Sequence, residues 1–233
     1  MTAARKILRI LLTATLFAAG GTACAPTAGA DVVTLTLVRH GQSAGNASGL
    51  MDTSVPGPTL TPLGGAQAEM IANRLRDNDF DGIYASTMVR TQESAQPMAD
   101  SLGREVTALP GLREIEAGDF EGQPESSSAK PYYGTVVDWT KGAVDERIPG
   151  SVDGNEFDAR FDDAVDQIIE DGSRNAVAYS HGAAIAAWTM LNVDNADPQL
   201  MLAEPLPNTG YVVVSRHDGR WHLDTWNGRA IGS

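Results

Sequence analysis

The residues best suited to chemistry in this chain are two histidines, each standing just beyond a run rich in apolar and β-branched residues and just before a glycine. His40 follows the run at 32–38 (VVTLTLV), and His181 follows the run at 176–179 (AVAY) by one serine. Side chains at the carboxyl end of a strand in an open α/β sheet project into the ligand crevice. Two strand-end histidines of this kind are hard to attribute to chance.

Two arginines accompany the histidines. Arg39 directly precedes His40, and Arg90 falls in the first turns of a helix expected after a short strand. A cation at the start of a helix opposes the helix dipole, so an anionic ligand explains its presence best. Gly182 opens another helix, whose amino end favours anions. Arginine forks match phosphate oxygens, and a neutral imidazole can attack phosphorus as a nucleophile. The constellation predicts a phosphoryl pocket.

The elements that would position these residues alternate between strand and helix. Apolar periodicity and turn residues predict strands at 32–38, 82–85, 105–109, 176–179, 210–214 and 221–226, and helices at 62–77, 90–102, 157–170 and 182–191. This alternation indicates one α/β domain with a largely parallel sheet. Residues 41–58 are rich in Gly, Ser, Asn and Pro and are expected to form a loop.

Residues from about 115 to 154 lack clear periodicity and carry Gly, Pro and Ser clusters. We expect an excursion that roofs the pocket, with one short helix near residues 132–139. Trp139 in this excursion is expected to lie where it could touch the leaving group of a substrate. The polar composition of the excursion does not indicate which substrate.

The first 30 residues resemble a secretory signal, with three basic residues before an apolar run at 10–19. The run is too short to span a bilayer, which needs about 20 apolar residues. Two cleavage sites compete. Cleavage after Ala30 would release residues 31–233, whereas residues 21–24 (GTAC) resemble a bacterial lipobox that would place a lipid on Cys24. Export to the cell envelope or secretion is expected either way, and membrane contact only through that lipid.

Charge and cysteine content exclude several classes of protein. The net charge is −13 at pH 7, and without residues 1–30 the remaining 14 basic and 30 acidic residues give −16. Such a chain repels nucleic acid and anionic lipid headgroups. The single cysteine rules out an internal disulfide and a thiolate metal cluster. The sequence holds no dense Asp/His cluster, so neither a metal nor another cofactor is expected. Composition leaves the oligomeric state open.

Ordered motifs make the chain similar to the histidine phosphatase superfamily, in its phosphoglycerate-mutase-like branch. Residues 39–46 (RHGQSAGN) resemble R-H-G-x-x-x-x-N, and residues 86–95 (STMVRTQESA) resemble S-x-x-x-R-x-x-x-[ST]-A. Further matches follow in family order at residues 112–122 (LREIEAGDFEG), 154–157 (GNEF), 179–183 (YSHGA) and 207–209 (PNT). Gln42 and Phe120 replace a glutamate and a tryptophan common in the family. The resemblance implies a three-layer sandwich, with helices on both faces of a mainly parallel sheet.

The resemblance also implies roles for single residues. His40 would be the nucleophile that forms a phosphohistidine. Arg39, Arg90 and His181 would bind the phosphoryl oxygens, and Asn46 would complete the pocket. Gly182 belongs to the same phosphate-binding set through its helix terminus.

The general acid would be Glu114, chosen by motif position over its rivals Glu116 and Glu121, which we expect on a loop surface. An alkoxide leaves poorly unless it is protonated, and a partly buried carboxyl can hold a proton near neutral pH.

Three functions compete. The leading one is an exported, metal-independent phosphomonoesterase that acts on a small phosphorylated substrate. A phosphoglycerate-mutase-type transferase is the second, although family mutases carry longer roofing segments than the 67 residues that separate Glu114 from His181 here. A non-catalytic, anion-binding envelope protein is the third, and it would need no nucleophile and acid together.

Overall fold

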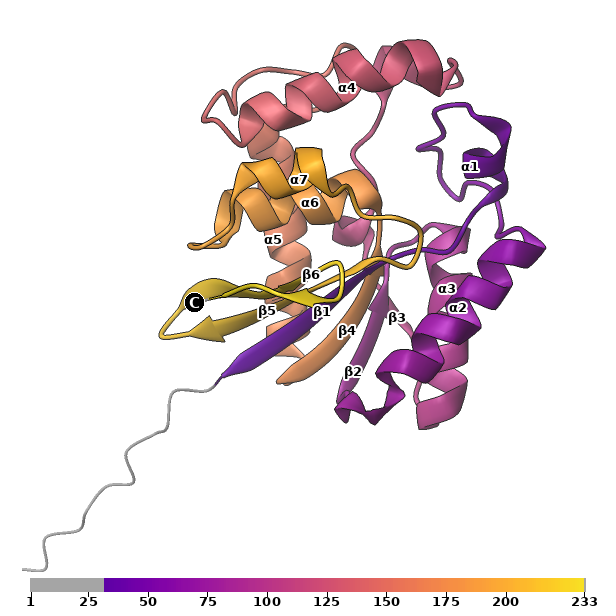
Figure 1. The fold of residues 1–233 in the computed structure, drawn as a ribbon, viewed down its shortest axis with the longest axis vertical. Helices are drawn as coiled ribbons and strands as arrows, with labels where there is room; N and C mark the ends of the chain where they lie inside the picture. Colours follow the sequence, from indigo (N-terminus) through magenta and orange to yellow (C-terminus); the bar gives the residue numbers. More distant parts are fainter. Residues whose placement is uncertain (1–31, 233) are drawn as a thin grey trace, which may run out of the picture.

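The computed structural model describes residues 32–232, and the predicted signal segment with Cys24 and Ala30 lies outside this range. One seven-stranded sheet has the order β3-β2-β4-β1-β5-β6-β7 (Figure 1). The strands are β1 (Val33–Arg39), β2 (Gly82–Ala85), β3 (Thr107–Ala108), β4 (Asn175–Ser180), β5 (Tyr211–His217), β6 (Arg220–Trp226) and β7 (Arg229–Ala230). Strands β1 to β4 pair in parallel, and β5 to β7 extend the sheet antiparallel.

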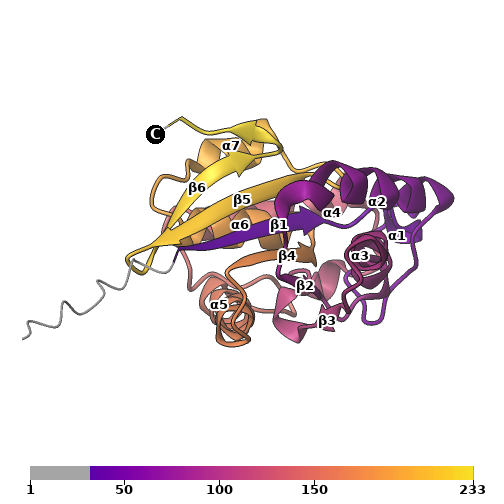
Figure 2. The same ribbon diagram turned by 90° about the horizontal axis from the view of Figure 1, so that it is seen from below.

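Helices cover both faces of this sheet (Figure 2). They are α1 (Ala44–Ser48), α2 (Pro62–Leu75), α3 (Val89–Leu102), α4 (Glu125–Trp139), α5 (Gly154–Glu170), α6 (Gly182–Asn192) and α7 (Pro198–Ala203), with 3₁₀ turns η1 (Arg76–Asn78), η2 (Pro110–Leu112) and η3 (Gly118–Phe120). The predicted α/β architecture is confirmed. Within residues 32–232 no helix is both long and apolar enough to cross a bilayer.

Alternation along β1 divides the core into two clusters. Leu35 and Leu37 pack with apolar residues of α4, α5 and α6 on one face. Val38 packs with residues of α2 and α3 on the other. A strand buried on both faces needs an almost continuous apolar run, as the sequence of β1 has. The arrangement fixes the ends of β1, β2 and β4 at one edge of the sheet.

Several predicted boundaries were wrong. Helix α4 has 15 residues and begins at Glu125, seven residues before the predicted start. Pro131 lies inside it, and the helix continues to Trp139 although an interior proline removes a backbone donor and crowds the carbonyl group four residues earlier. Helix α5 begins at Gly154 because Asp153 and Glu156 form a capping box. The predicted loop at 41–58 contains the short helix α1, and α7 was not predicted.

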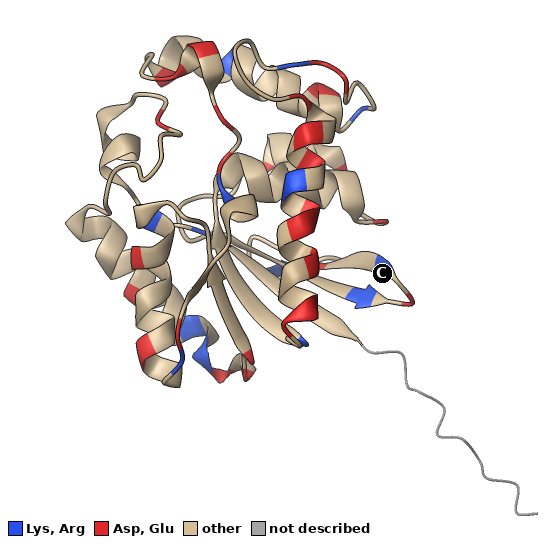
Figure 3. Cartoon of the chain, turned by 180° about the vertical axis from the view of Figure 1, so that it is seen from behind, with Lys and Arg blue, Asp and Glu red and all other residues tan. Residues whose placement is uncertain are grey.

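Charged residues are unevenly distributed over these elements. Figure 3 shows acidic residues at intervals along α5, whereas α1, α6 and α7 contain none. The closing hairpin turn is Asp218-Gly219, as predicted, and both residues have positive φ angles, 51° and 81°.

Candidate active site

The strand ends bring the two predicted histidines together. His40 directly follows β1, and His181 is the N-cap residue between β4 and α6. Because β1 and β4 are parallel neighbours, their carboxyl ends lie side by side, and Arg39 is paired with Ser180 in the register. The two imidazole rings meet edge to face with centroids 5.1 Å apart.

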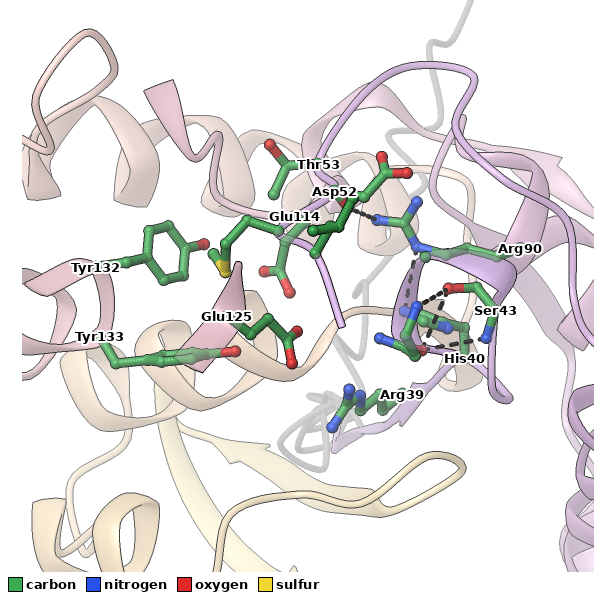
Figure 4. A pocket seen from close by; sticks show the side chains of 14 residues that line it. Arg39, His40, Ser43, Asp52, Thr53, Arg90, Glu114, Glu125, Tyr132 and Tyr133 are labelled. Atoms are coloured by element: carbon green, nitrogen blue, oxygen red, sulfur yellow. Dashed lines mark hydrogen bonds between the residues drawn. The ribbon is translucent and has the colours of Figure 1, made fainter. Parts of the chain in front are cut away.

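Figure 4 shows the cavity in front of His40, which we call the His40 pocket. It is small, with a volume of about 40 Å³. Its lining side chains come from β1, α1 and its following loop, α3, the segment after η2, and α4. They are Arg39, His40, Ser43, Asn46, Leu50, Met51, Asp52, Thr53, Arg90, Glu114, Glu125, Tyr132 and Tyr133, with Gly45.

The lone pair of His40 lies on Nε2, at the wall of this pocket. Its Nδ1 lies 2.6 Å from the Gly41 carbonyl oxygen, which can only accept, so Nδ1 holds the proton. Nε2 is therefore the acceptor and receives a hydrogen bond from Arg90 Nε at 3.2 Å. Burial lowers the pKa of His40 well below the ordinary value, and the charges of Arg90 and Arg39 add to this effect. A neutral imidazole with an aimed Nε2 lone pair is a competent nucleophile.

His181 is fully buried behind His40 and does not line the pocket. Its Nε2 lies 2.9 Å from Ser86 Oγ, and Ser86 Oγ lies 2.8 Å from Thr91 Oγ1. Its Nδ1 has no partner within residues 32–232. Burial, followed by the charge of Arg90, lowers the pKa of His181. Ser86 opens the second motif quoted above, but no feature of the sequence alone links it to His181.

The two arginines lie on either side of His40 with unused donors. Arg90 is 2% exposed and donates through Nη2 to the Asp52 carbonyl oxygen at 3.3 Å, while its Nη1 has no partner in the described chain. Arg39 donates through Nη1 to the Leu206 carbonyl oxygen at 2.6 Å, and its buried Nε is likewise without a partner there. Buried unpaired guanidinium donors cost free energy, so an anion that accepts from them would be bound tightly.

Gly182 contacts Arg39 instead of lining the His40 pocket. A Cβ atom at Gly182 would lie 3.3 Å from Arg39 Nε and 3.3 Å from Arg39 Cδ. The glycine thus gives the Arg39 side chain room to lie against the first turn of α6. Its role in phosphate binding stays a prediction, and the contact with Arg39 is the route by which it could act.

Asn46 lines the pocket and also holds α1 in place. Its Oδ1 accepts from the backbone N–H of Ser43 and from Asn208 Nδ2, both at 3.2 Å. Asn208 Nδ2 also donates to the His40 carbonyl oxygen at 3.1 Å. With its oxygen occupied, Asn46 has its amide N–H groups left to donate to a ligand.

Glu114 is the one of the three rival glutamates that lines the pocket. Its carboxylate accepts from the backbone N–H of Ile115 at 3.0 Å and of Ala184 at 2.9 Å, with Ala183 at 3.3 Å. Burial nevertheless raises its pKa; the Ile115 and Ala184 hydrogen bonds and the charges of Arg90 and Arg39 oppose the shift. A carboxyl of raised pKa can donate a proton to a leaving oxygen near neutral pH.

The rival glutamates have structural partners. Glu116 forms ion pairs with Arg113 at 3.8 Å and Arg160 at 3.6 Å. Glu121 accepts from the backbone N–H and the hydroxyl of Thr53, which joins the loop after α1 to the segment after η3. Neither lines the pocket.

The expectation that Trp139 touches a substrate was wrong. Trp139 is fully buried, stacks on Phe157 at 5.9 Å between ring centroids, and donates through Nε1 to the Glu146 carbonyl oxygen. Tyr132 and Tyr133 at the middle of α4 line the pocket instead, together with Glu125 at its first turn. Trp139 lies seven residues after Tyr132, two helical turns on the same buried face. A longer predicted helix would have revealed this spacing.

Comparisons with known proteins agree with the geometry. A family model for the histidine phosphatase superfamily (branch 1) matches residues 35–229. The chain is 44% identical over 218 residues to the PE-PGRS family protein PE_PGRS11 of Mycobacterium tuberculosis, which covers 86% of this chain but only 37% of that protein's length. It is 32% identical to the probable phosphoglycerate mutase GpmB of Yersinia pestis, which covers 82% of this chain and 88% of that protein.

Among solved structures, a mycobacterial glucosyl-3-phosphoglycerate phosphatase in complex with VO3 superposes with a TM-score of 0.70 and 25% identity, over 84% of this chain and 98% of that one. A second structure, described as mycobacterial hydrolase 1, has a TM-score of 0.71 at 24% identity over 85% of this chain and all of that one, and supports the fold alone. The chain therefore belongs to the histidine phosphatase superfamily, among relatives that include both phosphatases and phosphoglycerate mutases.

Proposed function

We propose that this protein hydrolyses phosphomonoesters through a phosphohistidine on His40, without a metal. The observation that carries the proposal is the pairing of a neutral imidazole, with its Nε2 lone pair directed into the pocket, and a carboxyl of raised pKa in the same small cavity. Nucleophile and general acid are the two groups that a displacement at phosphorus requires from the protein.

The reaction would run in two displacements. His40 Nε2 attacks phosphorus, the ester P–O bond breaks, and the leaving oxygen takes the proton of Glu114. Glu114, now a carboxylate, accepts a proton from water while that water attacks phosphorus and the P–N bond breaks. Inorganic phosphate leaves, and His40 and Glu114 regain their starting protonation.

The surrounding cations would hold the phosphoryl group during both steps. Arg39 and Arg90 each have a guanidinium donor without a protein partner beside His40, and a loose phosphoryl transition state is stabilised mainly by positioning and positive charge. His181, whose Nδ1 is also without a partner in the described chain, would donate from the other side of His40 once it carries a proton there. Asn46 would add an amide N–H.

A phosphoglycerate mutase is the second candidate, and the charges around the pocket favour hydrolysis over it. Among the described residues, Arg39 and Arg90 are the cationic side chains that line the pocket, and both lie beside the neutral His40. Glu125 and Asp52 also line it, and no hydrogen bond or ion pair reaches the Glu125 carboxylate within residues 32–232. A carboxylate on a phosphorylated acid would meet these like charges without a cation of its own.

Turnover of a generic aryl phosphate by the purified full chain, with a metal chelator present, tests the proposal. We expect phosphate release that persists under chelation and falls by about 10⁴-fold or more in His40→Ala, as when other covalent nucleophiles are deleted. His222→Ala, which removes a partly exposed histidine on β6, is the matched control. Equal activity in wild type and His40→Ala would refute the mechanism. Absence of hydrolysis with phosphoryl exchange onto phosphoglycerate would establish the mutase, and anion binding without either reaction would establish the binding protein.

We also propose that the chain is exported, with a lipid on Cys24 or with cleavage after Ala30. The support is the basic start, the apolar run and the small residues of the first 30 positions. Fractionation of cells that express wild type and Cys24→Ser tests this. Release of Cys24→Ser from membranes that retain wild type would support the lipid. A wild-type protein that is already soluble outside the cell favours cleavage after Ala30, and retention in the cytoplasm would contradict export.

A further inference from the structure

A second cavity opens beside the His40 pocket, between α4, α6 and α7. Its volume is about 330 Å³, within the usual range for a small-molecule site, whereas the His40 pocket has about 40 Å³. Its walls include Val137 of α4, Ala186 of α6, Met201 and Leu202 of α7, and Leu206 in the loop that follows. We call it the apolar groove.

The apolar groove adjoins the His40 pocket. Arg39 and Tyr133 line both cavities. Ala183 lines the groove with its side chain, while its backbone N–H reaches the carboxylate of Glu114 at 3.3 Å. The atom that Glu114 would protonate is the oxygen of the leaving alcohol, so the remainder of that alcohol begins next to the groove.

The chemistry of the walls discriminates between leaving groups. Apart from Arg39, no charged side chain of residues 32–232 lines the groove, and Arg39 already donates to the Leu206 carbonyl oxygen and also lines the His40 pocket. The hydroxyl of Tyr133 is the other polar side-chain group on its wall. A sugar or amino-acid group placed here would lose hydrogen bonds to water without replacing them. An alkyl chain or aryl ring would gain free energy by leaving water.

Exposure is consistent with a site that is open to a ligand. Met201 and Leu206 are buried at 8% and 3%, whereas Leu202 is 55% exposed and Tyr133 is 41% exposed. These exposed apolar side chains stand at the rim, where a bound apolar chain would cover them. Elsewhere, exposed apolar residues such as Leu63 on α2 have no cavity beside them among the described pockets.

We propose that the apolar groove binds the leaving group of the substrate, and that the preferred substrates are phosphomonoesters of alcohols with an apolar alkyl chain or aryl ring. The inference rests on the proposed function, because it identifies the groove by its place beside the phosphoryl pocket. It also predicts poor use of short, polar esters, since these leave the groove empty.

The test compares ethyl, butyl and hexyl phosphate with the full chain. Burial of a methylene group strengthens binding by about fourfold, so kcat/KM should rise by up to about that factor per added methylene until the groove is full. Calorimetric binding of the same esters to His40→Ala, which cannot be phosphorylated on that residue, should show the same trend in Kd. Equal kcat/KM and equal Kd along the series, with all three esters hydrolysed, would overturn the groove assignment and leave the hydrolase intact.

A charged substitution at the rim of the groove discriminates more strongly than the ester series alone. Leu202→Glu should reduce the ratio of kcat/KM for hexyl over ethyl phosphate by about tenfold, because a carboxylate must be desolvated beside the chain. Ala186→Leu, which fills the groove from α6, should reduce the same ratio. Leu63→Glu matches the first change in type and exposure, 54% against 55%, and should leave the ratio unchanged.

Two further outcomes distinguish failure of the proposed function from failure of the groove assignment. If no ester is turned over by wild type, the proposed function fails, and the Kd series still decides whether the groove takes an apolar chain. If Leu202→Glu changes the sedimentation of the protein from a dimer to a monomer and leaves the chain-length ratio unaltered, the groove is an interface between copies, and the inference is overturned.

Discussion

The His40 pocket and the apolar groove share Arg39 and Tyr133 but are built from different parts of the chain. The pocket gathers polar side chains from the end of β1, from α1 and the loop after it, and from α3, and sheet pairing of β1 with β4 holds Arg39 in register beside His40. The groove lies between three helices, and its lining residues other than Arg39 and Tyr133 are apolar residues and a glycine. Strand ends thus provide precise placement of charges, and helix surfaces provide a shape that binds without directional contacts.

The two regions should therefore respond differently to substitution. A change in the pocket alters turnover of every ester, whatever its chain length. A change in the groove alters only the preference among leaving groups. A pocket variant that altered only the preference among leaving groups, or a groove variant that slowed every ester, would contradict this division. A variant at the boundary between the two cavities would show where one role ends and the other begins.

The largest effect in this set is expected from Glu114→Gln. An alkyl phosphate should lose about 10²- to 10⁴-fold in kcat because its alkoxide leaves without a proton, whereas p-nitrophenyl phosphate should lose far less. Glu116→Gln is the matched control, because Glu116 pairs with Arg113 and Arg160 outside the pocket. Equal slowing of both esters by Glu114→Gln would assign the general acid elsewhere.

The pH profile is the next largest effect. His40 must be neutral to act as a nucleophile. Because its pKa lies well below the ordinary histidine value of about 6.5, it stays neutral at pH 6.5, and kcat/KM should fall about tenfold per pH unit only at pH values below the lowered pKa. Glu114 must be protonated, and its raised pKa extends activity on alkyl esters above the ordinary carboxyl range before it falls with rising pH.

The measurement is kcat/KM against pH for hexyl phosphate and p-nitrophenyl phosphate, corrected for the second ionisation of each ester, which lies near pH 6 for alkyl phosphates. The alkaline fall should be absent for the aryl ester and in Glu114→Gln. An alkaline fall of equal size in both esters and in the variant would contradict the assignment of Glu114.

The smallest effect is expected at the boundary between the two cavities. Gly182→Ala places a methyl group 3.3 Å from Arg39 Nε, so the guanidinium must move by a few tenths of an ångström. We expect KM to rise by less than about tenfold for ethyl and hexyl phosphate alike. Gly134→Ala on α4, where a Cβ meets nothing within 4 Å, is the control. A rise confined to hexyl phosphate would place Gly182 with the groove alone.

Local sequence patterns were sufficient to predict the features that depend on a few adjacent residues. The start of α2 at Pro62, capped by Thr61, and the turn at Asp218-Gly219 were predicted because a cap or a turn depends on a few adjacent residues. Helix α7, of six residues, was not predicted because so short a helix is stabilised mainly by the elements it packs against. The start of α4 was predicted wrongly because Pro131 suggests a helix boundary that tertiary packing overrides.

By itself, the sequence determined the α/β class and the set His40, Arg39, Arg90, Glu114 and His181, because strand ends and family motifs are local and ordered along the chain. The tertiary structure alone decided which nitrogen of His40 carries the lone pair, since that depends on the Gly41 carbonyl oxygen and on Arg90 of α3. It also showed that Glu114 lines the pocket while Glu116 and Glu121 do not. Tyr133 lines the pocket, whereas Trp139, which was expected near the substrate, does not. Burial, tautomer and cavity shape arise only where distant segments pack together.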